Sequence, residues 1–177
     1  DYKKMITMDF KETDNIVLVI GKTEGHIDQS LLSRIILNEN NGPPPEVNLF
    51  NEKNNGLTLF NLIEKNFIKS AHDVSLGGII TAISKMCIKG DKGIQIKKPK
   101  FLINEIEYFF AEDQGRYLIE INPKDFKEVC KILDKNSVHY DEIGKIIDKE
   151  MIIDQKTKLT IDELKSYNTN WLKSYMV

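Results

Sequence analysis

Five consecutive apolar residues, Ile16 to Ile20, constrain the fold of this chain more than any other segment. Four of them are β-branched, a composition that suits strands, and Gly21 ends the run. A short, uninterrupted apolar run that stops at a turn residue predicts a buried strand.

The rest of the chain alternates unevenly between helical and strand-like patterns. The spacing of apolar residues and of helix-start signals predicts helices from Ser30, over 47–67 and 79–88, from Asn122-Pro123, and over 160–175 around Leu164, Trp171 and Leu172. It predicts strands at the end of 109–121, over 139–147 and over 151–153, with a proline-rich loop over 38–45 and a polar turn over 70–78. We therefore expect one α+β domain over residues 1–177, a mixed β-sheet with packed helices.

Composition excludes several classes of protein. The chain has 177 residues, 41% hydrophobic and 29% charged, which suits a globular domain, and its net charge of -2 argues against a nucleic-acid binder. No stretch approaches the roughly 20 apolar residues of a membrane span, and no signal-peptide core follows Asp1. Cys87 and Cys130 lie in apolar helical patterns, so we expect reduced core cysteines and a cytoplasmic protein. Asp1 opens a polar run without Met, which suggests a segment of a longer chain.

The segment with the strongest chemical signal is His72-Asp73-Val74-Ser75-Leu76-Gly77-Gly78. Adjacent glycines at the start of a helix let a ligand approach the backbone, and unpaired helix N–H groups favour phosphate. Asp73 and Ser75 offer hard oxygen atoms, which Mg²⁺ prefers. The alternative is structural: an N-cap followed by glycines that permit a tight turn.

Two further segments carry weaker signals. Gly21 to Ser30 is a glycine-punctuated polar loop, which suits either a pocket rim or a surface loop that Ser30 closes as a helix cap. Glu112-Asp113-Gln114-Gly115-Arg116 suits either a cation site or a solvated turn, with Arg116 pairing with one of the carboxylates. No phosphate-loop motif, dinucleotide-binding glycine motif or nucleophile elbow occurs in the sequence.

Taken in order, these segments resemble the AIR-synthase-related superfamily, and most closely the C-terminal domain of the synthetase subunits of phosphoribosylformylglycinamidine synthases. The resemblance covers nearly the whole chain. It rests on the loop 21–30, the proline segment 42–49, the motif His72-Asp73-x-Ser75-x-Gly77-Gly78 and the acidic turn 110–117.

The resemblance implies a part in purine biosynthesis. The family's ligase converts formylglycinamide ribonucleotide, ATP and ammonia into formylglycinamidine ribonucleotide, ADP and phosphate, with Mg²⁺. Its partners are the N-terminal domains of the same chain, a glutaminase subunit that supplies ammonia and a small accessory subunit. The implied nucleotide contacts are His72, Ser75, Gly77 and Gly78, and the implied metal ligand is Asp73, in a site that supports the fold and does not catalyse.

The same resemblance places the catalytic residues outside this chain, so we expect the isolated segment to be inactive. Two positions depart from the family pattern: Asp28 replaces a usual glycine, and Leu76 replaces a usual aspartate. The alternatives are a C-terminal domain of aminoimidazole ribonucleotide synthetase, thiamine monophosphate kinase or selenophosphate synthetase, and a non-catalytic interaction module.

Overall fold

The chain forms one seven-stranded sheet in a computed structural model that describes residues 4–98, 104–153, 155 and 157–176. The strands are β1 (Ile16–Ile20), β2 (Ile68–Val74), β3 (Gly93–Ile96), β4 (Arg116–Ile121), β5 (Tyr140–Ile147), β6 (Glu150–Ile153) and β7 (Thr157–Thr160). Their order is β2-β4-β1-β5-β3-β6-β7, and β3 pairs with β6 in parallel while the other neighbours are antiparallel. The predicted α+β fold with a mixed sheet is confirmed.

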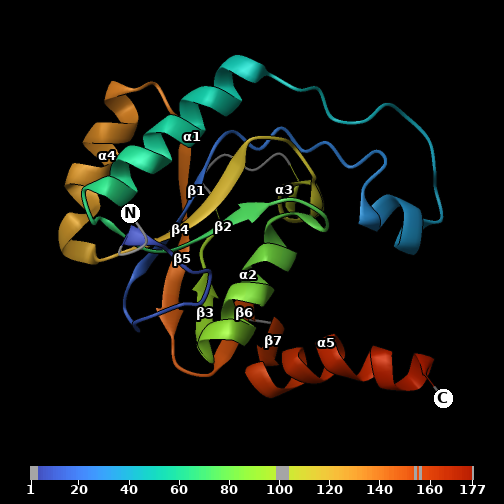
Figure 1. Cartoon of the computed structure of the whole chain (residues 1–177). Helices are drawn as coiled ribbons and strands as arrows, with labels where there is room; N and C mark the ends of the chain where they lie inside the picture. Colours follow the sequence, from blue (N-terminus) through green and yellow to red (C-terminus); the bar gives the residue numbers. More distant parts are fainter. Residues whose placement is uncertain (1–3, 99–103, 154, 156, 177) are drawn as a thin grey trace.

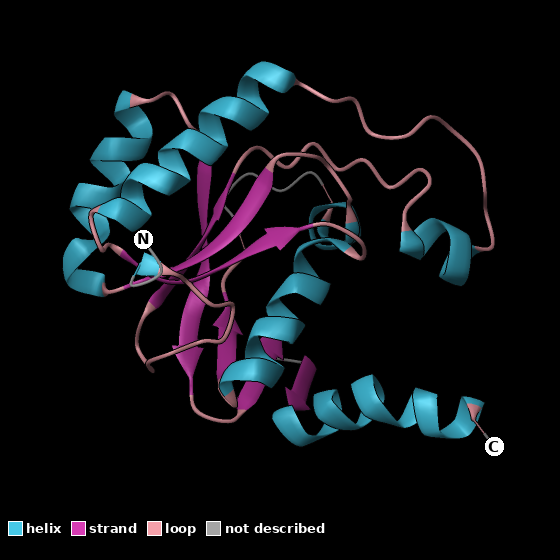
Figure 2. Cartoon of the chain, viewed as in Figure 1, coloured by secondary structure: helices cyan, strands magenta, loops and turns pink. Residues whose placement is uncertain are grey.

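Helices cover both faces of this sheet (Figure 1). In chain order, the helices are η2 (Leu32–Leu37), α1 (Leu49–Glu64), α2 (Gly78–Gly90), α3 (Glu105–Phe110), η3 (Pro123–Asp125), α4 (Phe126–Lys135) and α5 (Ile161–Tyr175), and η2 lies away from the sheet. Helices α1 and α4 lie together over one face, and α2, α3 and the first turn of α5 pack on the other. Figure 2 shows the resulting three layers.

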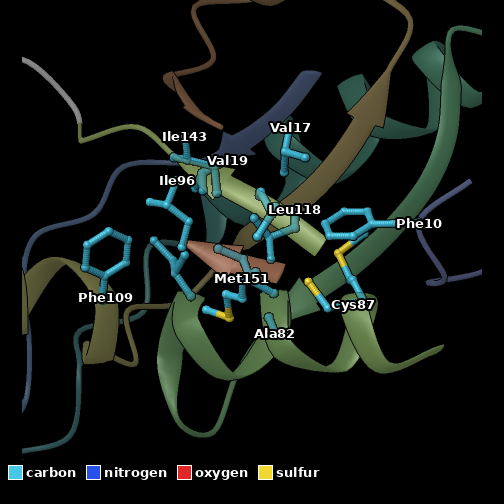
Figure 3. Close-up of a cluster of buried hydrophobic side chains, with 14 of the residues drawn as sticks. Phe10, Val17, Val19, Ala82, Cys87, Ile96, Phe109, Leu118, Ile143 and Met151 are labelled. Atoms are coloured by element: carbon cyan, nitrogen blue, oxygen red, sulfur yellow. The ribbon is translucent and has the colours of Figure 1, made fainter. Parts of the chain in front are cut away.

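Strand β1 lies inside the sheet between β4 and β5, which explains its uninterrupted apolar run. Val17 and Val19 point into the core under α2, while Leu18 and Ile20 point into the core under α1 and α4. Figure 3 shows Val17 and Val19 among the side chains of the core under α2. Because both faces are covered, each residue of the strand can be apolar, and the prediction of a buried strand is confirmed.

The prediction of a polar turn over 70–78 was wrong for its first half, which belongs to strand β2. Residues 68–74 form an edge strand on β4, and only the residues after Val74 turn. Ser70 is buried there because its hydroxyl donates a 2.7 Å hydrogen bond to Glu120 Oε2. A polar strand of this kind has no alternation of apolar residues, so the sequence pattern indicated a turn.

Helix α3 and strands β3 and β7 were also not predicted.

Glu120 is a buried carboxylate that fastens the start of the chain to the sheet. Its two oxygens accept hydrogen bonds from the backbone N–H groups of Lys11 and Glu12 and from Asn15 Nδ2, at 2.9, 3.1 and 2.6 Å. Together with the Ser70 hydroxyl, these donors replace the water that the carboxylate loses on burial.

The two cysteines are both unpaired thiols, and Cys87 is fully buried while Cys130 is only partly buried. Burial raises the pKa of the Cys87 thiol to about 12. The prediction of reduced core cysteines is therefore confirmed for Cys87, whereas Cys130 is a free thiol that is only partly buried. Among the described residues, no helix is both long and apolar enough to cross a membrane.

Helix α5 differs from its prediction in what it buries. Leu164 packs into the core, but Trp171 and Leu172 are 61% and 48% exposed. The helix begins against the sheet and then extends beyond it (Figure 1). The predicted helix is confirmed, but of the three apolar residues on which the prediction rested only Leu164 is buried.

We predict that the chain folds on its own, because two apolar cores span it from Phe10 to Leu164. Thermal unfolding should be cooperative and coincide in far-UV and near-UV circular dichroism. The near-UV signal should come from the buried edge-to-face pair Tyr108 and Phe109, whose ring centroids are 5.2 Å apart. A broad transition with dye binding to exposed apolar surface would contradict this prediction.

Candidate functional site

The glycine turn lies between strand β2 and helix α2. Gly77 and Gly78 have φ values of +82° and +69°, in the left-handed region that side chains rarely adopt. A Cβ on Gly78 would lie 2.6 Å from the backbone oxygen of Phe109 and 2.7 Å from that of Ala111. Adjacent glycines before a helix are typical of such a tight turn, and both are required by its shape.

The amide groups of this turn already have acceptors inside the domain. Gly77 N–H donates a 2.8 Å hydrogen bond to Glu112 Oε1, and Gly78 N–H donates a 3.0 Å bond to the carbonyl of Ser75. Leu31 N–H donates to the same Glu112 oxygen at 2.8 Å. A carboxylate of the protein therefore lies at the start of α2, where the sequence left open a phosphate site or a purely structural glycine turn.

His72 and Asp73 differ in how much solvent they see. His72 Nδ1 lies 2.9 Å from Asp73 Oδ1, and the side chains are 12% and 64% exposed. The other ring nitrogen of His72, Nε2, is buried and has no hydrogen-bond partner among the described residues. Asp73 thus presents an oriented carboxylate to the surface next to Ser75, which is also exposed. Asp73 near the end of β2 and Ser75 in the following turn are thus both exposed to solvent.

The loop from Gly21 to Ser30 is held by Asp113. The Asp113 carboxylate accepts hydrogen bonds from the backbone N–H groups of Glu24, Gly25 and His26, at 3.0, 3.1 and 3.1 Å. The side chain of Asp113 is only 8% exposed. The acidic segment was expected to be a cation site or a solvated turn, but at Asp113 it is a buried anchor for a loop that lies about 90 residues earlier in the chain.

Arg116 completes this anchor as a fully buried cation. Its guanidinium donates hydrogen bonds to the carbonyl oxygens of Asp113 and Ala111 and to Thr23 Oγ1, at 3.1, 2.7 and 3.0 Å. Arg116 Nη1 also lies 3.8 Å from Asp113 Oδ2. Burial lowers the pKa of Arg116, and the nearby carboxylate of Asp113 opposes that change. The predicted pairing is therefore with Asp113, and we call Arg116 and Asp113 the clasp.

A polar pocket of about 640 Å³ opens beside the clasp. Its walls include the loop residues Glu24, Gly25 and His26, together with Asp113, so part of the 21–30 segment does form a pocket rim. Ser30 instead is buried and accepts a hydrogen bond from Ser33 N–H, as a cap would. Sequence reasoning missed other walls, which include Asn48 at the N-cap of α1, Asn51 and Asn55 within α1, and His139. Their only local signal was Asn48, which caps α1.

No group of three His, Cys, Asp or Glu side chains suited to a metal occurs in the part of the chain that the structure describes. Asp73 alone offers one carboxylate, and Leu76 provides no second one. Any cation at this turn would need ligands from outside these residues.

Most of the chain is similar to one known protein family. The model of the "AIR synthase related protein, C-terminal domain" family matches residues 12–156. The chain belongs to this family.

Curated relatives of the chain are subunits called PurL. The chain is 66% identical over 176 residues to phosphoribosylformylglycinamidine synthase subunit PurL of Pelagibacter ubique, and 34% identical over 176 residues to that of Bartonella henselae. Each match covers 99% of this chain but 24% of the relative, so the chain spans about a quarter of their length.

Solved structures share the fold at low sequence identity. Thermotoga maritima PurL complexed with FGAR has a TM-score of 0.77 at 15% identity, covering 92% of this chain and 29% of that one. Escherichia coli HypE, a hydrogenase maturation protein, has a TM-score of 0.64 at 15% identity, covering 88% and 52%.

We predict that Gly78→Ala lowers the free energy of unfolding by roughly 1–3 kcal/mol, because a Cβ meets two backbone carbonyls at positive φ. Gly56→Ala is the matched control: Gly56 lies inside α1, and its added Cβ would meet only Tyr117 Oη at 3.7 Å. The control should be neutral or stabilise by up to about 1 kcal/mol. Urea unfolding of both variants measures the contrast, and equal effects would contradict it.

We predict that Arg116→Ala lowers the free energy of unfolding by about 3–5 kcal/mol, because it leaves the buried Asp113 carboxylate without its cation and three acceptors without a donor. Lys131→Ala, which removes an exposed ion pair with Glu128, should cost less than about 1 kcal/mol. Denaturant unfolding compares the two, and a small loss in Arg116→Ala would show that the clasp is dispensable.

Proposed function

We propose that this chain is the C-terminal AIR-synthase-related domain of a phosphoribosylformylglycinamidine synthase. That ligase converts formylglycinamide ribonucleotide, ATP and ammonia into formylglycinamidine ribonucleotide, ADP and phosphate in cytoplasmic purine biosynthesis. The observation that carries the proposal is the 66% identity to Pelagibacter ubique PurL across 176 residues. The fold is also that of Thermotoga maritima PurL, which has been solved in complex with ATP and with FGAR.

The domain would support a nucleotide and Mg²⁺ without performing catalysis. Asp73 supplies a solvent-facing carboxylate for the cation, Ser75 a hydroxyl for a phosphate oxygen, and His72 orients Asp73. Gly77 and Gly78 give the turn its shape: Thr81 and the backbone of 109–111 fill the space beside them, and their N–H groups bond to Glu112 and Ser75 and are not phosphate donors. These residues form one wall of a site, and the other walls belong to the N-terminal domains of the full chain.

The same proposal extends to partners. Thermotoga maritima PurL occurs in an assembly named PurLQS. We infer that the full protein here works with a glutaminase subunit, which supplies ammonia, and with a small accessory subunit.

A second superfamily function is less well supported. HypE shares the fold, but 15% identity carries no more than the fold. A stand-alone interaction module is disfavoured by the 66% identity to a phosphoribosylformylglycinamidine synthase subunit.

We predict that this chain can replace its counterpart segment in Pelagibacter ubique PurL. The chimera should convert the ribonucleotide with ammonia at a kcat/KM within roughly tenfold of the parent, a difference of about 1.4 kcal/mol in the barrier. A matched chimera that carries Gly78→Val should lose stability and activity together. A folded, nucleotide-binding chimera without turnover would contradict the proposed function.

The isolated chain should release no ADP from ATP with Mg²⁺, ammonia and the ribonucleotide, because it lacks the several oxygen ligands and the clamp that phosphoryl transfer needs. Any nucleotide binding should be weak, Mg²⁺-dependent and lost in Asp73→Ala, while Glu128→Ala on α4 should leave it unchanged. Steady turnover that survives further purification and disappears in Asp73→Ala would show that the chain is a complete enzyme.

A further inference from the structure

Helix α5 carries one apolar stripe along its whole length but buries only the first part of it. Ile161, Leu164, Tyr167, Trp171 and Tyr175 follow each other at intervals of three or four residues, which places them on one side of the helix. Ile161 and Leu164 are 1% and 8% exposed, whereas Tyr167, Trp171 and Tyr175 are 75%, 61% and 82% exposed. We call the exposed part, Tyr167, Trp171, Leu172 and Tyr175, the α5 overhang.

The overhang belongs to a helix that is firmly fixed at its start. Thr160 and Glu163 form a capping box, and Lys165 pairs with Asp91 at the end of α2. Asp91 also pairs with Lys149, 2.8 Å away. Figure 1 shows α5 leaving the sheet after this anchored turn, with its C-terminal end away from the body of the domain. The stripe is thus presented in a defined direction.

The chemistry of the overhang is that of an interface core. It contains three aromatic residues and a leucine, no charged group, and the rings of Trp171 and Tyr175 lie 6.4 Å apart. The other side of the same helical turns carries Ser166, Thr169, Asn170 and Lys173. Trp and Tyr are enriched and charged groups depleted where proteins contact each other, and contiguous exposed apolar patches mark such sites.

We propose that the α5 overhang is the docking surface for the rest of the same polypeptide, which buries it as a permanent intramolecular interface. This inference rests on the proposed function. The relatives match 99% of this chain with 24% of their own length, so about three quarters of such a polypeptide lies outside these residues. A segment tethered in the same chain reaches the overhang at a high effective concentration, and an uncharged aromatic surface suits a permanent contact.

The test uses the full-length chimera of this chain in Pelagibacter ubique PurL, with p-benzoylphenylalanine in place of Trp171. Irradiation should cross-link position 171 to a peptide outside the chimera's inserted segment, at a yield independent of protein concentration. The matched control has the same photoreactive residue in place of Thr169, on the polar side of the helix, and should give little of this product. Mass spectrometry of the digested protein identifies the cross-linked peptide.

Three outcomes would overturn the proposal. Cross-links to a second copy, with a yield that rises with protein concentration, would make the overhang a self-association surface. A cross-link that forms only when the glutaminase subunit is added would assign the surface to that partner. The absence of any cross-link at position 171 would show that the overhang stays in solvent.

A second pair of variants measures the energetic consequence. In the same chimera, Trp171→Asp should lower the thermal midpoint by at least a few degrees, while Thr169→Asp, which adds the same charge on the other side, should not. Equal midpoints would count against docking. An active chimera without the cross-link would overturn only the docking, and an inactive chimera with it would overturn only the proposed function.

Discussion

The geometry of the site depends on the hydrogen bonds that the buried guanidinium of Arg116 donates. It reaches Asp113, Ala111 and Thr23 at once, and Asp113 in turn holds three amides of the loop that follows β1. Loops have few apolar contacts of their own, so a charge-assisted network in the interior is what gives this end of the sheet a single geometry. The polar pocket and the glycine turn are both built against the segment that contains the clasp.

Glu112, next to the clasp, determines what the glycine turn can do. A helix start with glycines at its N-cap and first position can bind an anion, and here the Glu112 carboxylate accepts hydrogen bonds from Gly77 N–H and Leu31 N–H. The carboxylate ties two segments together and removes the Gly77 N–H from ligand binding. Chemistry at the turn therefore falls to side chains, namely Asp73 and Ser75. A single carboxylate and a hydroxyl make part of a coordination shell, which fits a domain that contributes one wall to a larger site.

Sequence reasoning succeeded where the signal is local and failed where a partner lies far along the chain. The run Ile16–Ile20 and the positive φ of Gly77 and Gly78 follow from the side chains, or lack of them, at those positions. Ser70 and Asp113 looked solvated because polar residues usually are. Each is buried, because Glu120 lies 50 residues beyond Ser70 and the amides of Glu24 to His26 lie almost 90 before Asp113. No rule based on sequence spacing predicts these pairings, because the order of the strands in the sheet brings the partners together.

Helix α5 shows a different limit, because its periodicity was read correctly and its burial was not. A stripe at helical spacing indicates that one side of a helix contacts an apolar surface. It does not indicate whether that surface belongs to the same domain or to another one. Leu164 meets the core of this domain, and Trp171, two turns later, meets none of the described residues closely enough to be buried. An aromatic stripe that continues beyond the core of its own domain is typical of an interface, since polar residues are favoured on a helix face that stays in solvent. With the proposed docking, the apolar pattern of α5 reflects two contacts: the core of the domain at its start and a surface outside the domain beyond Leu164.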